Sequence, residues 1–208
     1  MAALTGTLLD LRAGERKVAL LMGANYYLLL LFYYLMKPAR DSLFLVELNP
    51  HQLPIVYILT ALVAAPVTAA YARAGMKWRL HRLILLTTVV LVLNLIVLYW
   101  LIPASSDWVI YFFYSWVGVA GGLTTSQFWL QANGVFDAAQ AKRIFPILGL
   151  GGIAGAFTGG EVTSFLVQNL GLQTQDLLLV SAAVLATAGV LGWLVWREKA
   201  VAQEAIPE

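Results

Sequence analysis

Six long apolar segments run along the chain and limit its fold more than any other feature. They cover about residues 18–47, 53–72, 82–102, 108–132, 144–168 and 177–196. Each is long enough to cross a hydrocarbon core about 30 Å thick, which takes roughly 20 residues of helix. The runs are continuous rather than alternating, and this excludes the strands of a membrane barrel. The sequence therefore predicts an all-α membrane protein of six transmembrane helices.

The basic residues predict how these helices are oriented. Eleven of the 13 lysines and arginines fall before the first span, between the second and third, between the fourth and fifth, or after the sixth. Such residues mark the cytoplasmic side of a membrane. We expect a cytoplasmic N-terminal segment (1–17), a six-span bundle (18–197) and a cytoplasmic C-terminal tail (198–208), in a bacterial-type inner (cytoplasmic) membrane.

Composition and motifs argue against several classes of function. The chain is 61% hydrophobic and 12% charged, and it has no cysteine and two histidines. A thiolate metal site is thus impossible, and we expect no metal site and no cofactor. No phosphate-binding loop, zinc-protease motif or nucleophile elbow is present, so we expect no enzyme. We expect membrane lipid as a partner, and no nucleic acid.

Three charges interrupt the first apolar segment. Lys37, Arg40 and Asp41 stand at positions i, i+3 and i+4, so they project from one helical face. Arg40 lies about 10 Å before the end of the span, and Glu161 lies at a similar depth in the fifth span, at 1.5 Å per residue. These four charges sum to zero. They form either a closed ion-pair cluster that joins two helices or a set of substrate-binding and pathway residues.

Small and amide residues mark the fourth and fifth spans. Stripes of small residues allow membrane helices to approach closely, and we expect such packing at Gly118, Gly122, Gly151, Gly155 and Gly159. The amides Gln131 and Asn133, at the inner end of span four, are candidates for the pathway. They could equally be hydrogen-bonded struts between helices.

Two stretches resemble one known family. FWLQANGVFDAAQAKRIFPILGLGGIAG (128–155) carries F-W-x-x-A-N, then A-K-R, then G-L-G, and KPARDSL (37–43) lies in the first span. They resemble the nucleotide transporter (ATP/ADP translocase) family, which has E-A-K-R and L-F-G-L-G-A at the first site and R-x-x-K-D-T-L at the second. The order of the two cations is swapped here, because Lys37 stands for arginine and Arg40 for lysine. The two side chains differ in how they bind phosphate.

The resemblance implies a fold and a function. Such proteins are similar to major facilitator transporters, in which two six-helix halves surround a midplane site. This chain resembles the N-terminal half. We therefore expect a half-size secondary transporter of an anionic metabolite, such as a nucleotide or phosphate ester, working as a homodimer or with a second membrane subunit. The alternatives are a non-transporting accessory subunit that keeps the half-transporter fold, and the N-terminal portion of a longer transporter.

Overall fold

The computed structural model describes residues 13–104 and 106–204, and these residues form helices and no strand. The long apolar runs become helices because every backbone group can then bond within its own segment. The α-helices are α2 (Ala13–Glu47), α3 (Leu53–Lys77), α4 (Leu80–Leu101), α5 (Asp107–Val135), α6 (Ala138–Gln168) and α7 (Asp176–Glu204). Two short 3-10 helices, η1 (Pro50–Gln52) and η2 (Ile102–Ala104), precede α3 and follow α4.

Five of these helices are long and apolar enough to cross a membrane. They are α2, α3, α4, α6 and α7. Helix α5 has 29 residues, which is length enough, but it is rich in tyrosine, tryptophan, serine, threonine and glycine and is not among the five. Its buried residues include Ser115, Thr124, Gln127 and Gln131, so much of its polar surface faces protein. The sixth crossing stays a prediction.

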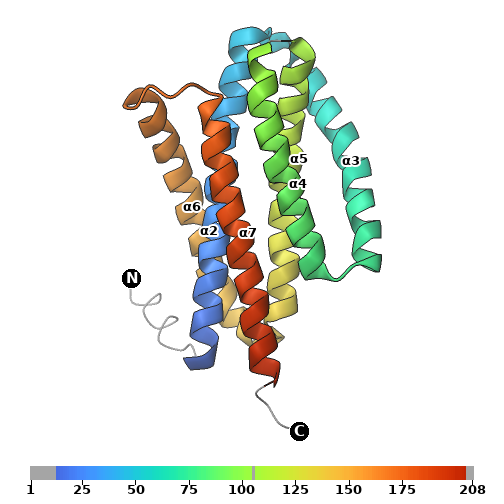
Figure 1. Ribbon diagram of the computed structural model, residues 1–208, viewed down its shortest axis with the longest axis vertical. Coiled ribbons are helices and arrows are strands. Elements are labelled where there is room, and N and C mark those ends of the chain that lie inside the picture. Colours follow the sequence, from blue (N-terminus) through green and yellow to red (C-terminus); the bar gives the residue numbers. More distant parts are fainter. Residues whose placement is uncertain (1–12, 105, 205–208) are drawn as a thin grey trace.

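The helices run up and down in an antiparallel bundle (Figure 1). Helix α2 lies in the middle and packs against α5, α6 and α7, while α4 packs against α7 and α3 leans mainly on α5. One end of the bundle holds the start of α2, the last residues of α7, and the α3–α4 and α5–α6 turns. The described basic residues of the four polar segments therefore gather at this end, here called the basic end.

The core consists of large apolar side chains between these helices. Phe32, Met36, Leu95, Phe113 and Leu178 belong to the largest cluster, which joins α2, α4, α5 and α7. A second cluster around Phe128, Ile144 and Leu148 joins α2, α5, α6 and α7 toward the basic end. Helix α3 contributes one fully buried residue, Val56. The five helices α2, α4, α5, α6 and α7 thus form a packed body, and α3 rests on its side.

Glycines make the contact between α2 and α6 close. A methyl group on Gly151 would lie 2.6 Å from the Gly23 carbonyl oxygen, and one on Gly155 would overlap the Tyr27 carbonyl. A methyl group on Gly159 would lie 2.7 Å from Tyr34 Cβ. The three glycines predicted for packing in α6 therefore lie where the backbone of α2 touches this helix. The two predicted in α5 differ from each other: a methyl on Gly118 would meet Thr60 at 3.1 Å, whereas one on Gly122 would meet no atom within 4 Å.

Candidate functional site

Arg40 is the buried charge at the centre of the candidate site. Its side chain is only 10% exposed, and its Nε donates to Asp41 Oδ1 over 3.1 Å. Its guanidinium carbon lies 4.3 Å from the ring centroid of Tyr114 on α5. A guanidinium over an aromatic face is attracted by the negative face of the ring. Arg40 is thus held by a carboxylate on one side and a ring on the other.

Helices α3 and α5 form a polar wall beside this guanidinium. The hydroxyl oxygens of Thr60 and Ser115 lie 3.2 Å apart, and those of Tyr57 and Tyr114 lie 3.5 Å apart. A Cβ on Gly118 would lie 3.6 Å from Arg40 Nη1, at ordinary contact distance, so this part of α5 faces the guanidinium. Helices α3 and α5 therefore place hydroxyl groups on the side of Arg40 that faces Tyr114 and Gly118.

The other charges of the first span are more accessible than Arg40. The Asp41 side chain is 42% exposed, and Lys37 is exposed, with Nζ 5.6 Å from the ring centroid of Tyr34. Among the described residues Lys37 forms no ion pair. The shared face predicted for the three charges is therefore split: Arg40 points into the bundle, while Lys37 and Asp41 lie toward its surface.

Glu161 is not the partner of Arg40. Within the described residues no ion pair joins the two, and Glu161 is exposed. The reason is the rotation of α6, because its contact with α2 runs along Gly151, Gly155 and Gly159. Glu161 follows Gly159 by two positions, or about 200° around a helix of 3.6 residues per turn. Glu161 therefore does not close an ion pair with Arg40, which was the first of the two alternatives, and Lys37, Arg40 and Asp41 alone sum to +1. A pathway role for Glu161 stays a prediction.

The two amides predicted for the pathway take different positions. Gln131 is buried and donates to the Gly192 carbonyl of α7 over 2.9 Å, so it links two helices. Asn133 is exposed and donates to the Trp129 carbonyl of its own helix. Asn25 was not predicted as a site residue: it is buried and donates to the Ala188 carbonyl over 2.6 Å. Its one signal in the sequence is an amide within an apolar span.

The geometry suits an anion better than a metal ion. No group of three histidine, cysteine, aspartate or glutamate side chains that could hold a metal occurs in residues 13–104 and 106–204. Arg40 has five N–H donors, of which Nε serves Asp41. Guanidinium and ammonium groups bind phosphate and carboxylate through charge-assisted hydrogen bonds. Arg40 and Lys37 are the groups that can do so here.

Comparison with known proteins finds distant relatives among carriers. The chain is 30% identical over 119 residues to ADP,ATP carrier protein 3 of Rickettsia bellii, a match that covers 47% of this chain and 23% of that protein. The corresponding proteins of Rickettsia prowazekii and Rickettsia conorii are 30% and 29% identical over 116 residues, with the same coverage. The match thus spans less than a quarter of the length of these relatives. No family model and no solved structure matches the chain. Together with the apolar helices, these relatives indicate a multi-pass membrane protein with a distant, nucleotide-transporter-like relationship.

Proposed function

We propose that this chain is one half of a secondary transporter for an anionic metabolite, with a nucleotide or another phosphate ester as the substrate class. A second half, either another copy of the chain or a different membrane subunit, completes the cavity. The bundle then corresponds to the N-terminal half of a major-facilitator-type transporter in an inner membrane, with the basic end in the cytoplasm. The distant likeness to ADP,ATP carriers supports the substrate class.

The observation that carries this proposal is the exposure of charges deep within the spans. Lys37 and Asp41 lie about 15 Å and 9 Å before the end of α2, and Glu161 about 10 Å before the end of α6. All three are accessible on the isolated bundle. A charge facing hydrocarbon costs at least about 2.5–3.5 kcal/mol, so such residues line protein or water-filled cavities. This surface therefore requires a cover, and a second half around a wet pathway provides it.

The charge balance favours an anion in that pathway. Because Asp41 pairs with Arg40 and no described carboxylate pairs with Lys37, the local set of Lys37, Arg40 and Asp41 carries a net charge of +1. Arg40 is positioned by Tyr114 and Asp41, whereas Lys37 is exposed, lies near the Tyr34 ring and has no carboxylate partner among the described residues. In the transport cycle the two cations bind the anion from one wall, and the two halves rock around it.

The alternative is an accessory subunit that keeps the fold without transporting. It is favoured by the same exposed charges, because a larger membrane complex covers them equally well. Native mass spectrometry of the chain, purified gently from its own membranes, separates the assemblies. A mass of two 22.7 kDa chains, or of one chain and a second transporter half, supports transport. A large assembly of unrelated subunits contradicts it.

Substitution at Arg40 then tests the site in the reconstituted assembly. We expect Arg40→Ala to reduce the uptake of labelled ATP, ADP or phosphate at least tenfold, because the buried cation is lost. The double variant Arg40→Met with Asp41→Asn removes both charges and keeps the side-chain volumes similar. Replacing both partners of a buried ion pair in this way often leaves the fold intact. Full folded yield without uptake supports the site. Normal uptake by this double variant would overturn it, and Arg197→Gln, an exposed cation at the basic end, is the control.

A further inference from the structure

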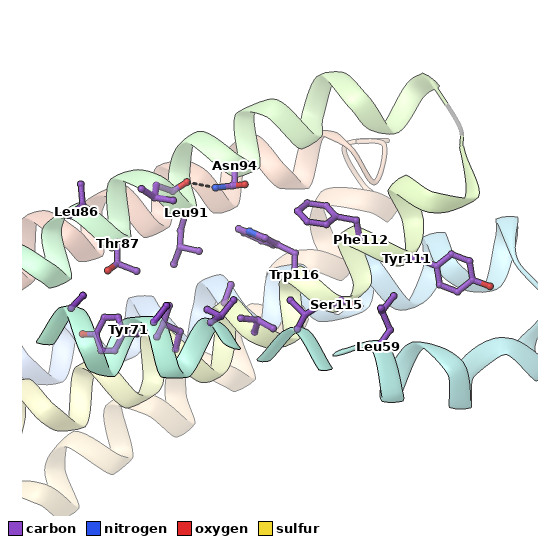
Figure 2. Close-up of a pocket in the computed structure, with 18 of the residues that line it drawn as sticks. Leu59, Tyr71, Leu86, Thr87, Leu91, Asn94, Tyr111, Phe112, Ser115 and Trp116 are labelled. Carbon is purple, nitrogen blue, oxygen red and sulfur yellow. Dashed lines mark hydrogen bonds between the residues drawn. The ribbon is translucent and has the colours of Figure 1, made fainter. Parts of the chain in front are cut away.

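A long apolar groove lies between α3, α4 and α5; Arg40 does not line it, although Ser115 belongs both to this groove and to the wall beside Arg40. Its volume is about 640 Å³, and its walls include Val63 and Val67 of α3, Val90 of α4, and Phe112 and Val119 of α5. Figure 2 shows these walls, with α3 and α4 on opposite sides and α5 side chains between them. Helix α3 touches α4 little, so the groove is bounded by helices that stand apart.

Most of the few polar groups in this groove are bonded within the protein, although the buried Tyr71 hydroxyl has no hydrogen-bond partner among the described residues. Asn94 donates to the Val90 carbonyl over 2.7 Å, the dashed contact in Figure 2, and Thr87 donates to the Leu83 carbonyl over 2.6 Å. The Ser115 hydroxyl lies by Thr60, and Tyr111 donates to Gln52. Little hydrogen-bonding capacity remains for a polar ligand. The groove therefore suits hydrocarbon and does not suit a nucleotide.

A second cavity extends the apolar surface toward the basic end. It has a volume of about 510 Å³ and shares Tyr71 and Leu123 with the groove. Its other walls include Gly75 near the end of α3 and Leu80 at the start of α4. Together the two cavities follow α3 from Leu59 to Gly75, about 24 Å at 1.5 Å per residue. Hydrocarbon chains lying here would end beside the α3–α4 turn.

That turn carries four exposed cations without acidic partners. They are Arg73, Lys77, Arg79 and Arg82, and none forms an ion pair within the described residues. The sequence has no aspartate or glutamate between Glu47 and Asp107, so α3 and α4 cannot neutralise them. By contrast, Lys17 pairs with Glu198 at 2.7 Å and Arg143 with Glu15 at 3.3 Å at the same end of the bundle. Trp78, 51% exposed, lies among the unpaired cations, as an interfacial anchor would.

We propose that the α3–α4–α5 groove is a binding site for an anionic phospholipid. The acyl chains lie along the apolar walls, and the phosphate contacts Arg79, Arg82 and their basic neighbours at the turn. Basic clusters at the end of apolar helices attract anionic headgroups. A neutral lipid fills the groove less well because it leaves the four cations uncompensated. The site is separate from Arg40 and holds whether or not the chain transports.

The test compares two lipids with the same acyl chains. The delipidated chain is titrated with phosphatidylglycerol or phosphatidylcholine and followed by native mass spectrometry and thermal unfolding. We expect at least tenfold tighter binding of phosphatidylglycerol. The double variant Arg79→Gln with Arg82→Gln should reduce this preference to about twofold or less. The matched control, Lys142→Gln with Arg197→Gln, removes two cations at the same end and should leave it unchanged.

A groove-filling variant separates the site from general surface attraction. Val90→Trp places a large side chain in the groove at a position that is 46% exposed, and it should weaken binding of both lipids. If Val90→Trp lowers the folded yield, Leu86→Trp, at a position that is 45% exposed, is used in its place. Equal binding of the two lipids, equal loss in the control, or a tight protein partner cross-linked to this groove in place of lipid would each overturn the proposal.

Discussion

The contact of α2 with α6 and the contact of α3 with its neighbours represent two opposite ways of joining membrane helices. At α2–α6 the backbones touch, because three glycines of α6 leave no side chain between them. Helix α3 instead leans on α5 through few contacts and leaves an apolar groove beside α4. In Figure 1, α3 stands at the edge of the bundle, whereas α6 lies beside α2.

This difference shows which contacts between helices stabilise the bundle. Without a hydrophobic drive between helices in lipid, close packing and hydrogen bonds supply the association energy. The α2–α6 contact supplies that packing and is reinforced at the basic end by the pair of Arg143 with Glu15. Helix α3 gains little from close packing, although its hydroxyl groups contact those of α5, and its stability depends more on what surrounds it. It also contributes Thr60 to the wall beside Arg40, so the loosest helix reaches the candidate site.

The largest effect is expected when the close contact is broken. In Gly155→Ala the new methyl group overlaps the Tyr27 carbonyl, a backbone atom that cannot rotate away. Overpacking of this kind costs about 1–3 kcal/mol. We expect a loss of that size in the free energy of unfolding, measured by denaturant titration of the chain in detergent.

Gly149→Ala is the matched control in the same helix. A methyl group there meets no atom within 4 Å, and alanine favours a helix over glycine by about 1 kcal/mol. We expect the control to be neutral or slightly stabilising. Equal destabilisation by both substitutions would show that the α2–α6 contact is not the tight one.

A smaller effect is expected from the hydrogen bond that ties α2 to α7. Asn25→Leu removes the donor to Ala188, and a bond between membrane helices contributes about 0.6–1.7 kcal/mol. Asn94→Leu is the control, because that amide bonds its own helix beside the groove. We expect a loss of unfolding free energy near 1 kcal/mol for the first and little for the second. If Asn94→Leu lost more unfolding free energy than Asn25→Leu, the bond between α2 and α7 would not be the more important of the two.

The helices could be predicted from the sequence because the signal is long and uninterrupted. Twenty apolar residues must be helical in lipid, and the turns follow from the polar segments between the runs. The gathering of basic residues at one end follows from the same segments. Helix α5 is the predicted span that is not among the helices long and apolar enough to cross a membrane, and much of it faces other helices.

The candidate site was harder to predict because it depends on how each helix is rotated. Glu161 and Arg40 lie at matching depths, but depth says nothing about the direction of a side chain, and Glu161 points away from α2. The same limit applies to Gly122, which belongs to a stripe of small residues yet lines a cavity. The cation–π contact of Arg40 with Tyr114 joins two residues that are 74 positions apart in the sequence. A single sequence read alone gives no information on such pairs.

The smallest effect is expected on the outer surface of α3. Ala65 is exposed there, and Ala65→Leu should change the unfolding free energy by no more than about 0.5 kcal/mol, as surface substitutions usually do. The matched substitution Ala39→Leu, at a residue of α2 that is 2% exposed, should be clearly destabilising. Both are measured on the isolated chain and on the assembly from native membranes. If Ala65→Leu is neutral in the chain but weakens the assembly, a partner covers α3, and its loose packing is a docking surface. If it is neutral in both, lipid covers α3, and the cover for Lys37 and Glu161 must lie on another face.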